Sequence, residues 1–177
     1  MCDFGSVVFL SLVWRVGKRE RKDKNVFKIV RTEALTDAIY LMDVEAPRVA
    51  KNCLPGQFVI VRGSEDGERI PLTICDYSRE AGTITIVFQV VGAATEMMKN
   101  LKVGDSFTDF VGPLGRPSEL VEEDLETLKN KKILFVAGGV GTAPVYPQVK
   151  WLHEHGVAAD VIIGGRSKEL IILEEQM

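Results

Sequence analysis

A short apolar run that ends in a cluster of glycines constrains this chain more than any other feature. Residues 133–137 read Ile-Leu-Phe-Val-Ala and predict a buried strand, which Gly138, Gly139 and Gly141 follow. A periodic segment then continues to Gly156 and predicts a helix that begins at the glycines. Glycines let the backbone approach a ligand closely, and a helix N-terminus offers free N–H groups and a positive dipole end. The segment therefore predicts a phosphate site and a nucleotide-linked function.

The spacing of these glycines differs from the common dinucleotide pattern Gly-x-Gly-x-x-Gly. Pro144 stands where that pattern has its third glycine, which serves close packing of the helix on the strand. A purely structural tight turn is therefore an alternative interpretation of the loop. As a cofactor site, the turn is predicted to contribute Gly138, Gly139, Gly141, Thr142, Ala143 and Pro144.

The next predicted strand, residues 159–163, does not end in the acidic residue that usually holds a ribose hydroxyl. Gly164 and Gly165 follow it, and then Arg166 and Ser167. A guanidinium group and a hydroxyl suit an additional phosphate or a ribose edge better than a carboxylate would. Arg166 and Ser167 are therefore predicted cofactor contacts, without a choice between NAD and NADP.

Composition is that of an ordinary globular protein and argues against several functions. The 177 residues are 46% hydrophobic and 27% charged, with a formal net charge of −3. This acidic balance argues against nucleic acid and membrane surfaces as partners. The three cysteines lie far apart without metal-ligand spacing, so we expect no metal site and no disulfide framework. Scattered cysteines of this kind indicate a reducing, cytoplasmic location.

Residues 26–115 predict a six-stranded antiparallel β-barrel. Short β-rich runs separated by turn residues are typical of all-β sandwiches and barrels. One short helix is expected at residues 95–101, with Thr95 as its N-cap. The expected strands cover residues 26–33, 38–45, 57–62, 69–76, 83–91 and 106–111.

A change of periodicity marks a second unit, so the predicted fold class is β followed by α/β. Residues 116–131 predict one polar linker helix, and residues 132–177 predict strand, glycine loop, helix, strand and the start of another helix. This order is that of the first elements of a parallel α/β layer, and further strands would be needed to complete its sheet. Residues 1–25 are expected to be a disordered extension, and translation from Val26 at a non-standard start codon is the alternative.

The barrel followed by Gly-Gly-x-Gly-x-Ala-Pro resembles the ferredoxin–NADP reductase superfamily over residues 26–177. Arg69–Ile74, Asp109–Gly115 and Gly139–Pro147 are most similar to the small flavin subunit of NADH-dependent ferredoxin–NADP reductases, also known as sulfide dehydrogenase. The electron-transfer subunit of dihydroorotate dehydrogenase is a near relative. The resemblance implies FAD on the barrel, NAD or NADP on the partial α/β unit, and hydride transfer from one to the other.

The same resemblance implies which barrel residues contact FAD. The family motif of arginine, any residue, an aromatic residue and serine matches Ile70–Thr73, with Arg69 one place early. Because strand side chains alternate between faces, this shift turns Arg69 away from the direction of the family's arginine. Thr73 keeps a hydroxyl for the reactive edge of the flavin and is the predicted catalytic residue. The predicted FAD contacts are Arg69, Pro71, Leu72, Thr73, Val91, Gly92 and Thr95.

The resemblance also implies partners: a larger flavin and iron–sulfur subunit in a heterodimer, and ferredoxin or a similar carrier. The resembled subunit has a C-terminal cysteine cluster for a [2Fe–2S] centre, which these 177 residues lack, so we expect a fragment of a longer subunit. An electron-transfer oxidoreductase subunit and a non-catalytic flavin-binding or docking module both stay open. An ordinary Rossmann dehydrogenase fits less well, because of the barrel and Pro144.

Overall fold

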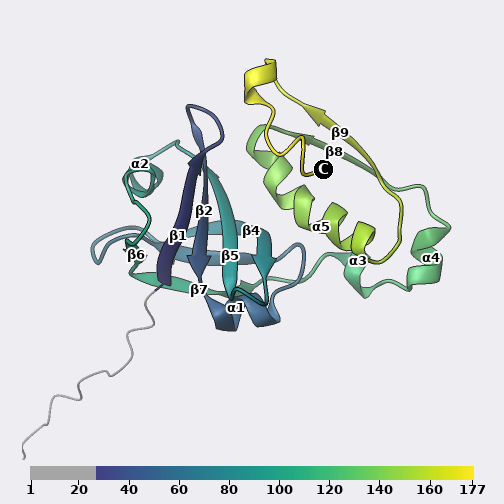
Figure 1. Cartoon of the computed structure of the whole chain (residues 1–177), viewed down its shortest axis with the longest axis horizontal. Coiled ribbons are helices and arrows are strands. Elements are labelled where there is room, and N and C mark those ends of the chain that lie inside the picture. Colours follow the sequence, from purple (N-terminus) through teal and green to yellow (C-terminus); the bar gives the residue numbers. More distant parts are fainter. Residues whose placement is uncertain (1–26) are drawn as a thin grey trace, which may run out of the picture.

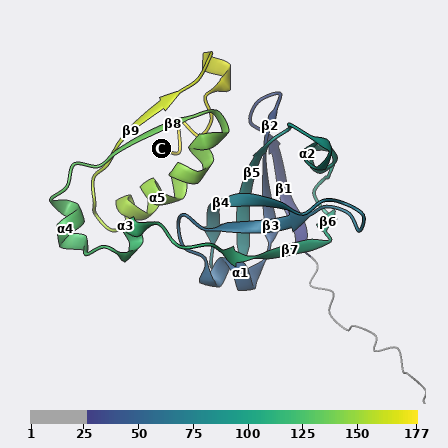
Figure 2. The same ribbon diagram turned by 180° about the vertical axis from the view of Figure 1, so that it is seen from behind.

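The computed structural model describes residues 27–177 as a β-barrel joined to a smaller α/β unit (Figure 1). The expectations for residues 1–25 and for Val26 lie outside this range. The barrel strands are β1 (Phe27–Ala34), β2 (Ile39–Glu45), β3 (Phe58–Arg62), β4 (Ile70–Ser78), β5 (Thr83–Gln89), β6 (Ser106–Phe107) and β7 (Asp109–Leu114). Figure 2, from behind, shows β3, β4 and β7 lying side by side across the barrel.

The barrel closes where the last predicted strand divides at Thr108. The strand order is β6-β1-β2-β5-β4-β3-β7, with antiparallel pairing throughout. Phe107 pairs with Phe27 on β1, whereas Asp109 pairs with Arg62 on β3. The Thr108 N–H donates to the Arg62 carbonyl oxygen at 2.8 Å, so the chain passes from one edge of the sheet to the other. The barrel sheet thus has seven strands instead of six, because a two-residue strand leaves no periodicity to detect.

Alternating side chains on the strands build the barrel core. On β5, Ile84, Ile86 and Phe88 are almost completely buried, and Ile74 on β4 joins them. Thr85 lies between them in sequence and is only partly buried, as the period of two requires. This core supports β4, the strand that carries the predicted flavin contacts.

Short helices cover parts of the barrel, and one of them corrects a prediction. α1 (Pro47–Asn52) was not predicted, and α2 (Ala93–Lys99) begins two residues before the expected helix. Gly92 is the N-cap of α2, so the prediction that Thr95 caps the helix is wrong. Thr95 is the third helical residue, and its hydroxyl oxygen accepts the N–H groups of Val91 and Gly92 at 3.0 and 3.1 Å.

The α/β unit begins with a divided linker. The prediction of one helix over residues 116–131 is wrong, because Glu123 is extended and separates two short helices. The Asp124 carboxylate then starts the second helix by accepting the Thr127 N–H at 3.0 Å. The elements of the unit are α3 (Glu119–Glu122), α4 (Leu125–Lys129), β8 (Leu134–Gly138), η1 (Gly139–Gly141), α5 (Thr142–Glu154), β9 (Asp160–Gly164) and η2 (Lys168–Leu170).

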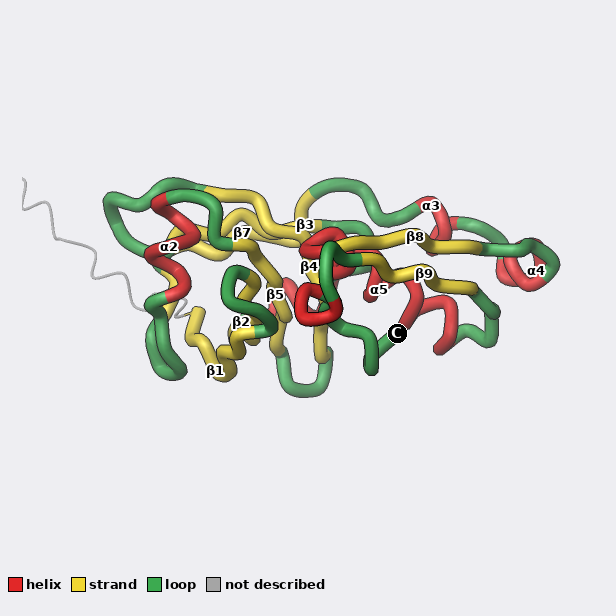
Figure 3. Tube along the Cα trace, turned by 90° about the horizontal axis from the view of Figure 1, so that it is seen from above, coloured by secondary structure: helices red, strands yellow, loops and turns green. Residues whose placement is uncertain are grey.

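The parallel pair β8 and β9 has one covered face and one open face in the described part of the chain. Phe135 is partly buried beside Leu152 of α5, whereas Leu134, Val136 and Ile162 are 57%, 70% and 55% exposed. The prediction of a buried strand is therefore wrong, because residues of β8 alternate between exposed and only partly buried. α5 is covered on both sides, since its other face lies against the barrel (Figures 1 and 3).

The end of the chain also differs from expectation. The predicted start of a last helix is the single turn η2, followed by an irregular segment. Ile172 and Leu173 of this segment are buried against barrel residues Ile39 and Leu41. No helix within residues 27–177 has both the length and the apolar character needed to cross a membrane.

Candidate functional site

The glycine segment forms the turn between β8 and α5, as the sequence predicts. Gly139 has a φ of +54°, in the left-handed region that favours glycine. A Cβ atom on Gly139 or Gly141 would meet no other atom within 4 Å, so the loop faces open space. On Gly138, by contrast, it would lie 3.1 Å from the Gly164 carbonyl oxygen. The turn therefore combines a close approach of two strand ends with an accessible backbone.

The first residues of α5 lie beneath this turn. Thr142 has no exposed surface, and its hydroxyl has no hydrogen-bond partner among the described residues. A buried polar group without a partner costs about 1–3 kcal/mol. Ala143 is buried against the barrel, and Pro144 occupies the first turn, where its missing N–H is not needed. Thr142 thus offers an unused hydroxyl beside the open loop.

A cavity of about 460 Å³ lies at the carboxyl ends of β8 and β9. Ligands of open α/β sheets bind at this end of the strands. The cavity brings together three of the predicted contacts, Gly138, Gly139 and Arg166. Its opposite wall belongs to the barrel and includes Thr36, Ala38, Ile39 and Gln89. The site therefore lies between the two units.

The barrel wall of the cavity was missed by sequence reasoning. The Thr36 hydroxyl oxygen accepts the N–H groups of Ala38 and Ile39 at 3.2 and 3.0 Å, which shapes the turn between β1 and β2. The sequence marks this segment only as a break between strands. Figure 3 shows the turn between β8 and α5 beside the barrel, a position that follows from the tertiary fold.

Arg166 and Ser167 occupy the exposed loop after β9, and the structure gives them different surroundings. Arg166 lines the cavity next to Gly139. Ser167 hydrogen-bonds to the side chain of Glu169 and thereby lowers the pKa of that carboxyl. Arg166 is therefore the member of this pair that borders the cavity.

The predicted flavin contacts on β4 divide between the two faces of the strand. Leu72 packs against the barrel core, on the same side as Ile74. Thr73 and Cys75 lie on the opposite face, and Cys75 packs with Ala143 of α5. The face that carries Thr73 therefore turns toward the α/β unit.

Arg69 is held in an ion pair at the start of β4. Its Nη2 lies 2.6 Å from Oδ2 of Asp109, and the same oxygen lies 2.8 Å from Nε of Arg62. The Arg69 side chain is 58% exposed, and Pro71 beyond it is exposed as well. Arg69 therefore has Asp109 as its anionic partner in this structure.

The predicted contacts at α2 stand apart from the cavity. Val91 is 79% exposed, and a Cβ on Gly92 would meet no atom within 4 Å. The N–H groups of both residues already donate to the Thr95 hydroxyl oxygen, which leaves those of Ala93 and Ala94 as first-turn donors. Figure 1 shows α2 and the α/β unit on opposite sides of the β1–β2 hairpin.

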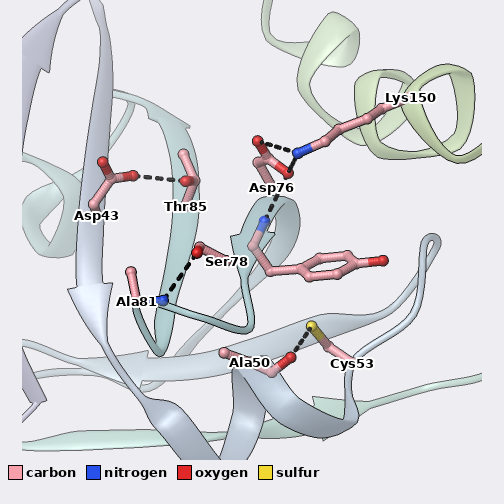
Figure 4. Close-up of polar contacts among 9 residues, drawn as sticks. Asp43, Ala50, Cys53, Asp76, Ser78, Ala81, Thr85 and Lys150 are labelled. Atoms are coloured by element: carbon pink, nitrogen blue, oxygen red, sulfur yellow. Dashed lines mark hydrogen bonds and ion pairs between the residues drawn. The ribbon is translucent and has the colours of Figure 1, made fainter. Parts of the chain in front are cut away.

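An ion pair joins the two units below the cavity. Nζ of Lys150 on α5 lies 2.7 and 3.0 Å from the two carboxylate oxygens of Asp76 on β4 (Figure 4). Partial burial lowers the pKa of Lys150, but the hydrogen bond and charge of Asp76 outweigh this effect and raise the pKa above its usual value. Lys150 is therefore a cation held against the barrel.

The described cysteines are buried thiols. Desolvation raises the pKa of Cys53 to about 11 and that of Cys75 to about 12, and for Cys75 the nearby charge of Asp76 adds to the effect. A nucleophilic or redox-active cysteine needs a thiolate, so neither group suits that chemistry near neutral pH. Residues 27–177 contain no cluster of histidine, cysteine and acidic residues that could hold a metal ion.

No protein-family model matches the sequence, but individual relatives and solved structures do. A Clostridium beijerinckii protein, described as an uncharacterized protein in the adh 3′ region, is 60% identical over 152 residues, which are 86% of this chain and 51% of the relative. The Thermotoga maritima homolog of the dihydroorotate dehydrogenase B (NAD(+)) electron transfer subunit is 39% identical over 149 residues, 84% of this chain and 50% of the relative.

A solved structure decides the family. The NADH-dependent reduced ferredoxin-NADP oxidoreductase matches with a TM-score of 0.78 and 37% identity, over 88% of this chain and 54% of that one. The chain belongs to the ferredoxin–NADP reductase superfamily. The resemblance inferred from the sequence is thereby confirmed, as is the fold class of this superfamily, a barrel followed by a parallel α/β unit. The chain spans about half the length of the curated relatives it matches.

Proposed function

We propose that this chain is the flavin-binding part, and the first part of the nicotinamide-binding unit, of an electron-transfer oxidoreductase subunit. The cavity between the glycine loop and the barrel is the observation that carries this proposal. A nicotinamide cofactor supplies a hydride and FAD accepts it, while the protein binds and orients both. We further propose that the subunit is cytoplasmic and passes the electrons to an iron–sulfur partner.

The glycine loop fits a nicotinamide cofactor. The open space at Gly139 and Gly141 leaves room for phosphate oxygens beside backbone N–H groups, and α5 directs its positive end to the same place. Thr142 adds a buried hydroxyl without a partner. Arg166 borders the same cavity and suits a phosphate or ribose edge. These residues would bind and orient the cofactor, and Ala143 and Pro144 would shape the helix start.

The barrel fits FAD at some of the predicted positions. The half-buried Thr73 lies on the strand face that turns toward the α/β unit, which suits a hydroxyl that orients the reactive edge of the flavin. Pro71 and Leu72 flank it, and the exposed segment from Val91 to Ala93, before the buried Thr95, suits the rest of the molecule. Arg69 fits less well as a phosphate ligand, because Asp109 already neutralises its charge.

The relatives support a role within a larger assembly. The Thermotoga maritima relative is named as an electron transfer subunit homolog, and the solved structure is that of a ferredoxin-NADP oxidoreductase. We therefore propose that this subunit forms a heterodimer with a larger flavin and iron–sulfur subunit, and that ferredoxin or a similar carrier receives electrons. Any [2Fe–2S] ligands would belong to the longer form of the subunit.

A non-catalytic flavin-binding or docking module is the second candidate. The open face of β8 and β9, with Leu134, Val136 and Ile162 exposed, favours it for the chain as given. A sheet of two strands offers fewer nicotinamide contacts than a complete parallel layer. The two candidates differ in one property, the reduction of bound flavin by NADH or NADPH.

Visible spectroscopy of the purified chain, loaded with FAD, freed of unbound FAD and kept under argon, separates the candidates. Flavin bands that bleach on addition of NADH or NADPH are the expected result. Bands that persist would favour the docking module, and a folded but colourless protein would overturn the flavin assignment. In Gly139→Val a side chain would enter the open space at a positive φ, so we expect retained FAD but no bleaching.

A further inference from the structure

We propose that Asp76 and Lys150 are positioning residues, whose ion pair sets the register of α5 along β4 and so aligns the glycine loop with the flavin-binding strand. The inference rests on the proposed function. Asp76 follows Thr73 on β4, and Lys150 follows Thr142 on α5. Both side chains are partly buried, and both carboxylate oxygens of Asp76 lie within hydrogen-bond distance of the ammonium group (Figure 4).

Helix α5 runs along the barrel in the same direction as β4. Near its start, Val140 shares a cavity with Gln89, at one end of β5. Further along, Lys150 shares a second cavity, of about 480 Å³, with Ser78 and with Thr83 at the other end of β5. β4 is antiparallel to β5, and Ser78 at the end of β4 pairs with Thr83 at the start of β5. Helix α5 and β4 therefore run in the same direction.

This common direction gives the ion pair a geometric consequence. Lys150 lies eight residues after Thr142, which is about 12 Å along a helix. Asp76 lies three residues after Thr73, across a β-bulge between Ile74 and Asp76, so β4 advances by less than the ~10 Å of a regular strand. The pair therefore keeps Thr142, beneath the glycine loop, near the level of Thr73.

Other contacts of α5 with the barrel specify this register less sharply. Ala143 packs against Cys75 and Val87, but apolar contact is non-directional and tolerates sliding. A polar contact from Ser118 to Gln148, 2.7 Å long, joins α5 to the linker and not to β4. Among residues 27–177, the Asp76–Lys150 pair is the one salt bridge between α5 and the barrel.

Pulsed EPR distance measurement tests the positioning without any cofactor. Spin labels at the exposed positions 28 and 132 report on the barrel and the α/β unit in a Cys2→Ser background, where the buried Cys53 and Cys75 escape labelling. We expect a narrow distance distribution for the unmodified pair and a broad or shifted one for Asp76→Asn and Lys150→Met. Lys150→Arg, which keeps the charge, should restore the narrow distribution. Unchanged distributions in both disrupting variants would overturn the proposal.

Stopped-flow reduction of bound FAD by NADH provides the second readout. Since a misplacement of 1 Å can slow a reaction about a hundredfold, we expect Asp76→Asn and Lys150→Met to bleach roughly ten to a hundred times more slowly, with FAD affinity unchanged. Lys129→Met is the matched control, because it removes the exposed Lys129–Glu126 pair within α4. Equal rates in all variants would contradict the inference. If the unmodified chain does not bleach, the proposed function fails and the EPR measurement still decides the positioning.

Discussion

Gly138 and Gly164 lie opposite each other at the carboxyl ends of β8 and β9, so close that a Cβ on Gly138 would stand 3.1 Å from the Gly164 carbonyl oxygen. Gly141, three residues further along, has open space around it and an α-helical φ of −65°. The two glycines therefore serve different purposes. Gly138 satisfies a packing requirement, whereas Gly141 leaves room beside the helix start.

Alanine substitutions separate these purposes. We expect Gly138→Ala to lower the free energy of unfolding by about 1–3 kcal/mol, because the new methyl group overpacks against backbone. Gly141→Ala is the control and should be neutral or stabilise by up to about 1 kcal/mol, since alanine adopts its conformation without strain. Urea unfolding without cofactor measures both values. Equal losses for the two variants would contradict the assigned role of Gly138.

The buried hydroxyl of Thr142 predicts opposite effects on stability and on binding. We expect Thr142→Val to leave the cofactor-free protein as stable or about 1 kcal/mol more stable, because the variant removes a buried polar group that has no partner in the described structure. Because the hydroxyl is completely buried, we expect NADH binding to expose it by a shift of the glycine loop, so the binding of NADH should weaken in Thr142→Val. Thermal unfolding and titration calorimetry measure the two effects. Thr142→Ser, which keeps the hydroxyl, should bind NADH more tightly than Thr142→Val does.

Arg69 is predicted to matter little for FAD. Because its side chain is 58% exposed and paired with Asp109, we expect Arg69→Ala to cost less than about 1 kcal/mol of stability. FAD affinity, measured by quenching of flavin fluorescence, should stay the same within error. Asp109→Asn should destabilise more strongly, because it also removes the carboxylate from the less exposed Arg62. A large loss of FAD affinity in Arg69→Ala would contradict this prediction and show that Arg69 contacts FAD.

The buried thiols predict a loss of stability at alkaline pH. Their pKa values are about 11 and about 12 in the folded protein, against 9.0 for an unperturbed thiol, so the folded state holds these protons more tightly. The free energy of unfolding should therefore fall as the pH rises from 9 toward 12. Tyr77 and Tyr146, whose pKa values burial also raises, act in the same direction.

A variant without the two buried cysteines isolates the contribution of their thiols. In Cys53→Ala/Cys75→Ala, the decline between pH 9 and 10 should be shallower, although the baseline stability will be lower. At pH 8, Ellman's reagent should modify Cys53 and Cys75 only after the protein unfolds. Rapid labelling of either residue in the folded protein would show an accessible thiolate and contradict the structure.

Part of the site could be predicted from the sequence because its signals are local. Gly139 and Gly141 follow a short apolar run and precede a periodic segment with Pro144, which is enough to predict a turn that opens a helix. The many β-branched residues in 83–91 likewise predict a barrel strand. The expected N-cap at Thr95 was wrong because threonine also bonds to the backbone from the third helical position.

By itself, the sequence determined the succession of a β-barrel and a parallel α/β layer, the glycine turn and the family, since these depend on residue types at short and regular spacings. Only the tertiary structure decided that the strand predicted at residues 106–111 divides at Thr108 and closes the barrel, and that the turn at Thr36 lines the cavity. It also decided that Asp109 forms its ion pair with Arg69 and that Asp76 forms its ion pair with Lys150. Each of these contacts joins segments that are distant along the chain. Hydrophobic burial brings such segments together, and this long-range packing cannot be predicted from the pattern of residues that are neighbours in sequence.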